Sequence, residues 1–288
     1  MACRVRPANV DDLPAVAAIT RRRRRRLADW EPEFWRMAGG ADAAHEEWLR
    51  QAIDGHDGRA RVLVSDDPAD AATAHGADTV VGCAVSTRCD GWWFLDDFAT
   101  ADDGWWTDGM AQLLRTVEEK PTITCVPRPD VRKAACCAAA GMRPRSAYWV
   151  LRYDGATPAT PAQVRRISRE DIGDSLPPAA PHTFGAPLDP GADGVVLLGD
   201  EHGGIGVLGR REAPPVYDPG GTSGLVDRID RKAPERLIDA ATAAARERGD
   251  VQLVVVCPDD APKLEEALID RGFHRVADVY GWPGQGTP

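Results

Sequence analysis

The chain has 288 residues, and its 35 lysine and arginine side chains are outnumbered by 45 aspartate and glutamate side chains, so its formal net charge is −10. This balance excludes nucleic-acid binding through a generally basic surface, which needs net positive charge. The length suggests two domains of ordinary size, and a hydrophobic content of 43% fits a soluble globular chain with a buried core. Six consecutive arginines, Arg21–Arg26, are a local exception to the acidic balance.

The sequence also predicts the cellular setting. No run approaches the roughly 18 apolar residues that span a membrane, and the first residues lack the apolar core of a signal peptide. The seven cysteines form no C-x-x-C pair and lie mostly in apolar stretches, which favours reduced, buried thiols over a zinc site. We expect a cytoplasmic protein with no bound metal, and the abundance of Ala, Gly, Pro and Arg is typical of a bacterial genome rich in G and C.

A segment without periodicity divides the chain. Asp154–Gln163 is rich in Pro, Thr, Ala and Gly, which is typical of a linker, so we predict domains at 1–155 and 156–288. In the first half, a helix is expected to begin near Leu13 after a cap at Asn9 or Asp11. The other predicted helices cover Asp42–Ile53, Gly109–Glu119 and Val131–Ala140, and the predicted strands cover Cys3–Ala8, Arg59–Ser65, Thr79–Thr87, Trp92–Thr100, Pro121–Pro127 and Ser146–Tyr153.

The second half repeats the order of elements that ends the first. After an irregular, proline-rich segment around Leu176–Pro187, it predicts helices over Pro234–Arg248 and Ala261–Arg271, and strands over Val164–Ile167, Asp193–Asp200, Gly203–Glu212, Gly224–Asp230, Val251–Pro258 and Val276–Trp282. The second and third of these strands form a predicted hairpin. Both halves end on strand, helix, strand, helix, glycine and strand, which indicates an internal duplication of pattern.

These segments resemble the GNAT superfamily of acyl-CoA-dependent N-acetyltransferases. VRPANVDDLPAVAAI resembles the first strand and helix of the family, and FLDDFATADDGWWTDGMAQLLRTVEE resembles its central strand, cofactor-binding turn and helix. RKAACCAAAGMRP and KLEEALIDRGFHR resemble the helix before its last strands. The resemblance implies two α/β domains in tandem, each with a mixed, mostly antiparallel sheet flanked by helices, with acetyl-CoA as cofactor.

The resemblance also implies where the cofactor binds. In this family the pyrophosphate rests on backbone N–H groups at a helix N-terminus, where the helix dipole favours anions. The family's Q/R-x-x-G-x-G/A turn falls on Trp106, Thr107, Asp108, Gly109, Met110 and Ala111. Gly109 and Ala111 match the pattern, whereas Trp106 replaces Gln or Arg and Asp108 places a negative charge beside the phosphate, which weakens binding.

Two further features concern cofactor binding. Backbone groups of Phe98 and Ala99 on the central strand are expected to hold the pantetheine arm. In the second half, the equivalent turn over 231–236 has no glycine, and Pro234 removes one N–H donor. We therefore expect only the first half to bind acetyl-CoA.

Acyl transfer to an amine needs a base for the amine and an acid for the departing thiolate. Many GNAT members use a carboxylate on or near the central strand as the base, which here offers Asp97, our preferred residue, and Asp96. Because the two are adjacent in a strand, we expect them to point to opposite faces, one of them into the cleft; a partly exposed strand end is the alternative.

The family's usual acid, a tyrosine four residues before the next helix-ending glycine, is replaced by Cys137. Cys137 and Tyr148 are the remaining candidates, and each also fits ordinary packing.

In this family the first helix and the loop after it wall the acceptor pocket, here ITRRRRRRLADWEPEFW. A straight helix places Arg23 or Arg24 on its core-facing stripe, where a guanidinium needs acidic partners. Either that arginine lines the pocket with Trp30 and Trp35, or the run is a solvated helix face beside aromatic core residues. The six histidines are scattered, and we interpret them as surface or capping residues rather than bases or metal ligands.

The sequence leaves functions of different classes open. The first is an acetyl-CoA-dependent N-acyltransferase acting on a small-molecule or peptide amine by direct attack in a ternary complex. The second is a catalytically degenerate GNAT-fold protein that senses a ligand or serves as a scaffold, which the weak turns and missing tyrosines favour. The third is anion or RNA binding through the arginine run, although no nucleic-acid partner is expected from the net charge. A homodimer is compatible with each of them.

Overall fold

The computed structural model describes residues 3–55, 58–66, 79–89, 92–106, 108–117, 122–153, 165–168, 170, 172, 176–182, 186–200, 203–211, 213–232 and 234–283. The predicted linker and the predicted boundary between residues 155 and 156 lie outside these residues. Contacts divide the chain into two compact units. The first contains Met1–Arg143, Pro215–Tyr217 and Tyr280–Gly286, and the second contains Pro144–Pro214, Asp218–Val279 and Thr287–Pro288. The first unit thus includes short segments from the second half of the sequence.

The first unit is built on a five-stranded arrangement. Its strands lie side by side in chain order: β1 (Cys3–Pro7), β2 (Gly58–Ser65), β3 (Thr79–Cys89), β4 (Trp92–Thr100) and β5 (Thr122–Pro127). Neighbours are antiparallel except β4 and β5, which are parallel. Because side chains alternate along a strand, Val62 and Val64 enter the core on one face and Leu63 enters the core on the other.

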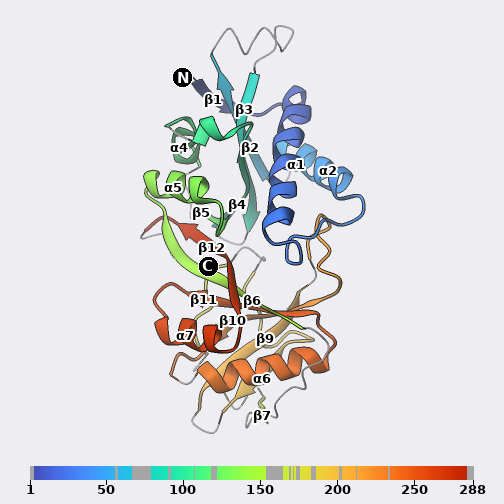
Figure 1. Cartoon of the computed structure of the whole chain (residues 1–288), viewed down its shortest axis with the longest axis vertical. Coiled ribbons are helices and arrows are strands. Elements are labelled where there is room, and N and C mark those ends of the chain that lie inside the picture. The colour runs from blue at the N-terminus through green and yellow to red at the C-terminus, as the bar shows by residue number, and fades with distance from the viewer. Residues whose placement is uncertain are drawn as a thin grey trace. The chain divides into compact units, whose positions relative to one another are not determined.

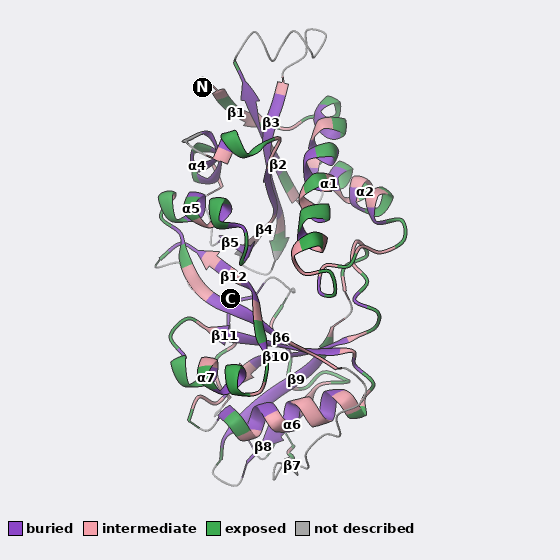
Figure 2. Cartoon of the chain, viewed as in Figure 1, coloured by how far each residue is buried: buried purple, intermediate pink, exposed green. Residues whose placement is uncertain are grey.

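Helices cover both faces of this sheet (Figure 1). Helices α1 (Leu13–Trp30) and α2 (Ala41–Ile53) pack on one face, and α4 (Asp108–Arg115) and α5 (Val131–Ala139) pack on the other. A 3-10 turn, η1 (Val10–Asp12), leads into α1 and is capped by Asn9 in a capping box with Asp12. A second 3-10 turn, η2 (Asp103–Trp106), precedes α4. Figure 2 shows the strands largely buried and the outer helix faces exposed.

Helix α4 ends earlier than the sequence predicts. The prediction extended it to Glu119, but the amide groups of Thr116 and Val117 donate to the carbonyls of Leu113 and Leu114, three residues back. Such bonds tighten and close a helix end, and they leave α4 with eight residues. Residues 118–121 lie outside the described part of the chain.

The other strands lie mostly in the second unit. They are β6 (Arg143–Arg152), β7 (Arg165–Arg166), β8 (Val196–Gly199), β9 (Ile205–Arg211), β10 (Ser223–Ile229), β11 (Gln252–Pro258) and β12 (His274–Gly281). They lie in the order β12-β6-β11-β10-β9-β8-β7, with β10 and β11 parallel. Helices α6 (Pro234–Glu247) and α7 (Pro262–Asp270) pack on the core of this sheet. Strand β6, which we placed in the first domain, joins the second unit because it pairs with β11 over its length.

The predicted fold class is confirmed: each unit has a mixed sheet flanked by helices, and most of the strand pairs are antiparallel. The duplicated order is present as β4-α4-β5-α5 and β10-α6-β11-α7. Gly141 and Gly272 end the last helix of each series with φ of 90° and 76°, a conformation that favours glycine. The two glycines follow Pro127 and Pro258 by the same number of residues (141 − 127 = 272 − 258 = 14), so the two series can be compared position by position.

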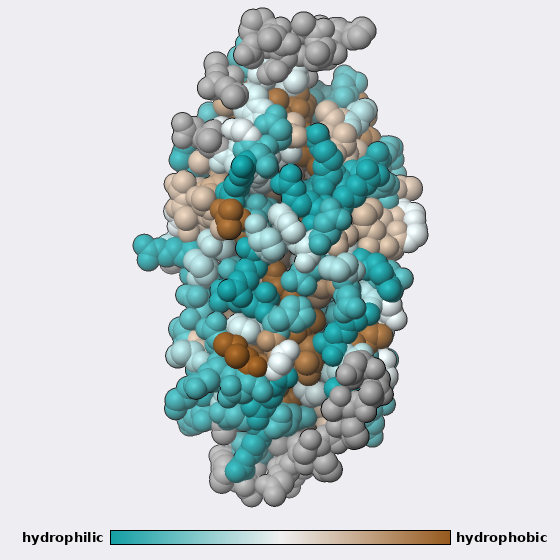
Figure 3. All heavy atoms as spheres, in the orientation of Figure 1, coloured by the Kyte–Doolittle hydropathy of each residue, from teal (hydrophilic) through white to brown (hydrophobic). Residues whose placement is uncertain are grey.

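The surface is mainly polar. Figure 3 shows hydrophilic side chains over most of the face in view, with apolar atoms in small areas between them. The large apolar side chains that are exposed, Val10, Val131 and Ile269, belong to three different elements. Among the described residues, no helix is long and apolar enough to cross a membrane.

Candidate active site

The parallel strands of the first unit separate partway along their length. β4 and β5 pair only from Trp93 to Leu95 and from Thr122 to Thr124. At the last pair, the hydroxyl of Thr124 donates to the carbonyl of Leu95 at 2.9 Å. Both strands continue beyond this point, so the edge of β4 that faces β5 has no strand partner after Leu95. Its backbone groups are available to a ligand.

A β-bulge lies directly after the last pair. Asp97 is opposite Val85 and Leu95 is opposite Ser86, so Asp96 is an extra residue in β4. Leu95 and Phe98 belong to the same core cluster, although simple alternation would put them on opposite faces. The bulge therefore interrupts the regular alternation of side chains along β4 at Asp96. That Asp96 and Asp97 point to opposite faces of the sheet stays a prediction.

Asp97 is held between His45 and Arg23. The residue is 3% exposed, and its Oδ2 lies 2.6 Å from His45 Nε2. Its Oδ1 accepts a hydrogen bond from Arg23 Nη1 at 3.2 Å. Burial by itself would raise the pKa of Asp97, but the hydrogen bond with His45 and the electrostatic interactions with His45 and Arg23 hold this pKa well below its usual value. Asp97 therefore stays ionised to lower pH than an ordinary aspartate.

Asp96 has the opposite character. Its backbone carbonyl accepts from Arg23 Nη1 at 3.4 Å, but its half-buried carboxylate makes no hydrogen bond to a described residue. Burial, and next the negative charge of Asp97, raise the pKa of Asp96 to about 6. A base with a pKa near the working pH is well matched to proton transfer. Asp96 is therefore the aspartate of this pair whose pKa lies nearer neutral pH.

A buried lysine lies on the α5 side of the same strands. Lys133 has no exposed surface; its Nζ donates to the carbonyl of Cys125 at 2.9 Å and lies 5.8 Å from the ring centre of Phe98. Burial, and next the charge of Arg23, lower the pKa of Lys133 to about 8. Buried titratable groups with perturbed pKa values cluster at functional sites. The sequence contained one signal for it, a lysine in an Ala/Cys-rich helix.

The two predicted acids lie in different units. Cys137 is fully buried in the core between α5 and the sheet, one helical turn after Lys133, with which it interacts electrostatically, and burial raises its pKa to about 11. Tyr148 is also fully buried, but on β6 of the second unit. Lys133 is a further titratable group beside the separated strands, and the assignment of the acid stays a prediction.

A pocket of about 430 Å³, open to solvent, lies at the end of β4. Its lining comes from α1, from the end of β4 and η2, and from the cap of α5: Arg22, Arg23, Arg26, Trp30, Ala99, Thr100, Ala101, Asp102, Asp103, Trp106 and Asp130. Arg23 both lines this pocket and holds Asp97, so the pocket is connected directly to the buried carboxylate.

The arginine run is mostly paired within the first unit. Helix α1 passes through it without interruption, and Arg24, 2% exposed, donates to Asp42 at 2.9 Å. Arg23 contacts Asp97, and Arg26 pairs with Asp103 at 3.2 Å. Both core-facing arginines therefore have the acidic partners that burial requires. Only Arg23 of these two lines the pocket.

The two aromatic residues predicted for the acceptor pocket, Trp30 and Trp35, lie in different surroundings. Trp30 lines the pocket, with Arg26 lying 5.9 Å from its ring centre. Trp35 packs instead against Phe34 and against Tyr217, at ring-centre distances of 4.6 and 5.2 Å. Tyr217 comes from the second half of the sequence and pairs with Met37 in a β-bridge. Burial raises its phenol pKa, and the charges of Arg23, Asp97 and Asp96 act on it, so sequence reasoning missed a tyrosine near these groups.

The predicted cofactor turn has a packing role that the sequence did not reveal. A Cβ on Gly109 would lie 2.8 Å from Leu63 Cδ2 and 3.1 Å from Cys3 Sγ, so glycine is needed there for close approach to β2 and β1. Met110 and Ala111 are buried in the same core, and Trp106 packs on Phe98 at 5.3 Å. Thr107 and the side chain of Asp108 lie outside the described residues. The backbone N–H groups of the first turn of α4 are what remains for a phosphate.

No protein-family model matches the sequence, and no curated protein matches it. Solved structures do match. A GCN5-related N-acetyltransferase from Sphaerobacter thermophilus is 14% identical, with a TM-score of 0.51 over 97% of this chain and 95% of its own. A proposed acetyltransferase from Thermoplasma acidophilum is 12% identical, with a TM-score of 0.51 over 97% and 99%. A tandem GNAT protein from the clavulanic acid biosynthesis pathway is 13% identical, at a TM-score of 0.43. At these identities the first two matches establish the fold.

Proposed function

We propose that this chain, which has the fold of the GNAT N-acetyltransferases, transfers an acyl group from acetyl-CoA to an amine in its first unit. One observation carries the proposal. Asp96, a half-buried carboxylate with a raised pKa, lies at the point where β4 and β5 separate, and the buried side chain of Lys133 donates to the carbonyl of Cys125 on β5.

The described residues fit an acyl-CoA cofactor. The unpaired edge of β4, at Phe98 and Ala99, offers backbone groups to the pantetheine arm, and the first turn of α4 offers N–H groups to the pyrophosphate. When bound, acetyl-CoA supplies an acyl group whose carbon–sulfur bond breaks as the amine nitrogen bonds to the acyl carbon. Direct attack in a ternary complex needs no covalent intermediate on the protein.

The protein's own groups manage the protons. Asp96 accepts the proton that the amine nitrogen loses, since its raised pKa allows this near neutral pH. Lys133 Nζ is the proposed acid: it carries the proton that the departing thiolate of the cofactor needs. Its pKa, lowered to about 8, allows it to release this proton near neutral pH. Asp97, paired with His45 and Arg23, contributes a fixed negative charge that keeps the pKa of Asp96 high. Asp97 is therefore a positioning residue rather than the base.

The acceptor is proposed to enter through the pocket at the end of β4. Asp102, Asp103 and Asp130 provide carboxylates for an amine-bearing substrate, and Trp30 and Trp106 provide aromatic walls. Arg22 and Arg26 add positive charge to the same lining, where Arg26 pairs with Asp103. A small-molecule amine that also carries an anionic group suits this mixed lining.

Calorimetric titration with acetyl-CoA, followed by thiol release in the presence of a panel of primary amines, tests the proposal. The expected result is saturable binding, and turnover that falls strongly in Asp96→Asn. The matched control is Asp227→Asn in the second unit, which should keep the activity. Absence of acetyl-CoA binding would contradict the proposal, and binding without turnover of any amine would favour a ligand-sensing protein.

A further inference from the structure

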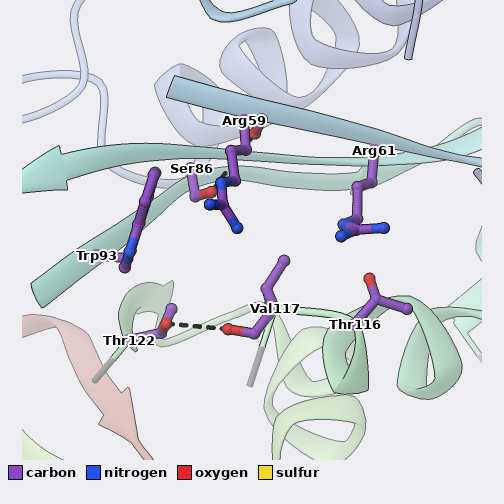
Figure 4. A pocket seen from close by; sticks show the side chains of 7 residues that line it. All are labelled: Arg59, Arg61, Ser86, Trp93, Thr116, Val117 and Thr122. Atoms are coloured by element: carbon purple, nitrogen blue, oxygen red, sulfur yellow. Dashed lines mark hydrogen bonds between the residues drawn. The ribbon is translucent and has the colours of Figure 1, made fainter. Parts of the chain in front are cut away.

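A second pocket of the first unit lies at the other end of α4 (Figure 4). It has a volume of about 310 Å³ including its opening to solvent, and it is lined by Arg59, Arg61, Ser86, Trp93, Thr116, Val117 and Thr122. The eight residues of α4 rise by roughly 12 Å, which separates this pocket from the candidate phosphate-binding turn at Asp108. No residue of the candidate active site lines it.

The lining has a strong positive charge. Arg59 and Arg61 are two residues apart on β2, so they leave the same face of the sheet. Figure 4 shows both side chains extending from β2 toward Thr116 and Val117 on the opposite wall. Among the described residues, no acidic side chain lines the pocket and neither arginine has an ion-pair partner. Two guanidinium groups without a described acidic partner stand out in a chain of net charge −10.

One of the arginines is held in place before any ligand arrives. The guanidinium carbon of Arg59 lies 5.0 Å from the ring centre of Trp93. A guanidinium that stacks on an indole keeps its N–H edges free for other partners. The stack therefore fixes the orientation of Arg59 at low entropic cost and leaves its donors available to the pocket.

The other polar groups of the lining already have partners. Thr116 Oγ1 donates to the carbonyl of Leu113 at 2.7 Å, and Thr122 Oγ1 donates to the carbonyl of Val117 at 3.2 Å, shown as a dashed line in Figure 4. Ser86 Oγ donates to the carbonyl of Arg59 at 3.4 Å. The unused hydrogen-bonding capacity of the pocket is thus in the guanidinium donors, which suit a ligand that only accepts.

We propose that this pocket binds the oxyanion of a small molecule, a carboxylate or a phosphate group, through Arg59 and Arg61. Guanidinium groups match both oxyanions because their paired N–H donors meet two oxygens at once.

Two-dimensional NMR of the tryptophan indole N–H groups in the full-length chain tests this site. The probes are inorganic phosphate and succinate at constant ionic strength, with sodium chloride as the reference, and the Trp93 signal is assigned by its loss in Trp93→Phe. A saturable shift of the Trp93 signal with phosphate, succinate or both is expected, and the stronger probe identifies the oxyanion. Arg59→Gln combined with Arg61→Gln should weaken binding by roughly 10-fold or more.

The matched control is Arg246→Gln. Arg246 also stacks on an aromatic ring, Tyr153, at 4.6 Å, but in the second unit, and its loss should leave the Trp93 response unchanged. The single variant Arg59→Lys keeps the charge but not the paired donors, so it should bind more weakly than the parent while folding normally. A Trp93 response equal to that of chloride, or equal affinity in the parent and the Arg59/Arg61 double variant, would overturn the proposal.

Discussion

The two units place an aspartate at the same point of their sheets and give it opposite surroundings. In each unit, parallel pairing ends one residue before a β-bulge, so Asp96 of β4 corresponds to Asp227 of β10. Asp96 is half-buried, and its carboxylate makes no hydrogen bond to a described residue. Asp227 is 1% exposed, accepts from the Leu188 amide at 2.7 Å and lies 3.2 Å from His182 Nε2. The carboxylate at this position is half-buried without a described hydrogen bond in one unit, and buried with two described partners in the other.

A second pair of positions differs in the same way. Lys133 and Leu264 each lie six residues after the proline that ends the preceding strand (133 − 127 = 264 − 258 = 6), and each is 0% exposed. The first unit therefore buries an ammonium where the second buries an apolar side chain. In the second unit the irregular segment also reaches the bulge, since the Ala180 amide donates to the carbonyl of Asp227 at 2.8 Å. The comparison indicates that the shared fold places an aspartate at the same position of both units. The neighbouring side chains then determine whether its carboxylate is available to accept a proton.

The largest effect is expected when Asp96 and Asp227 are each replaced by asparagine and the activities of the two variants are compared. Asp96→Asn should lower kcat/KM by roughly 10²- to 10⁴-fold, because a general base is lost, and should hardly change stability. Asp227→Asn should leave kcat/KM unchanged and lower the free energy of unfolding by about 1–3 kcal/mol, because a buried acceptor is weakened. Steady-state kinetics and denaturant unfolding measure the two effects. Equal loss of activity in both variants would mean that the units do not differ as described.

The next prediction concerns Lys133 and Leu264, each replaced by the residue found at the equivalent position of the other unit. Lys133→Leu should lower kcat by roughly 10- to 100-fold and leave the protein folded, since it removes a buried charge. Leu264→Lys should lower the free energy of unfolding by roughly 2–5 kcal/mol and leave the kcat of the folded fraction unchanged, because it buries an ammonium without a built partner. Single-turnover kinetics and thermal unfolding separate these outcomes. Full activity in Lys133→Leu would remove the lysine from the mechanism.

The pH dependence should follow from the first unit alone. Asp96 must be ionised to accept a proton, so kcat/KM should rise as the pH passes about 6. Lys133 must carry its proton to donate it, so kcat/KM should fall as the pH passes about 8. A pH profile measured under subsaturating substrate checks both limbs, and Lys133→Leu should lose the alkaline one. Retention of that limb in the variant would assign it to another group.

The smallest effect concerns Asp97. Because its negative charge raises the pKa of Asp96, Asp97→Asn should shift the acidic limb of the pH profile to lower pH. Asp66→Asn is the control, since Asp66 is an exposed partner of Arg4 and should leave the limb in place. In the parent protein, the lowered pKa of Asp97 stabilises the folded state above the ordinary aspartate pKa of about 4, and this stabilisation is lost as the pH falls further. Acid unfolding curves of the parent and Asp97→Asn should therefore converge at low pH.

Local patterns predicted most elements, because periodicity and capping are local properties. The helix ending at Gly141 and the strand holding Asp96 and Asp97 were both readable from spacing. The partner of β6 was not, since alternation identifies a strand but not the sheet that it joins. The bulge at Asp96 was equally hidden, because it depends on the register with β3.

The site residues that sequence reasoning missed had weak or no local signals. His45 shares the buried stripe of α2 with Leu49 and Ala52, at helical spacing, which could have marked it as an inward-facing histidine. Tyr217 had no such signal, because its contacts with Met37 and Trp35 bring it in from the distant half of the sequence. Long-range pairing of this kind is set by the folded chain as a whole.

Calorimetric titration of the full chain with acetyl-CoA tests the central claim, that the first unit alone carries the acyl-transfer site, most directly. We predict one binding site per chain, with the same affinity in the parent and in Asp227→Asn. Two sites per chain would show that the second unit keeps a cofactor site, and no binding would show that the separated strands of the first unit do not accept the cofactor; either result would contradict the account.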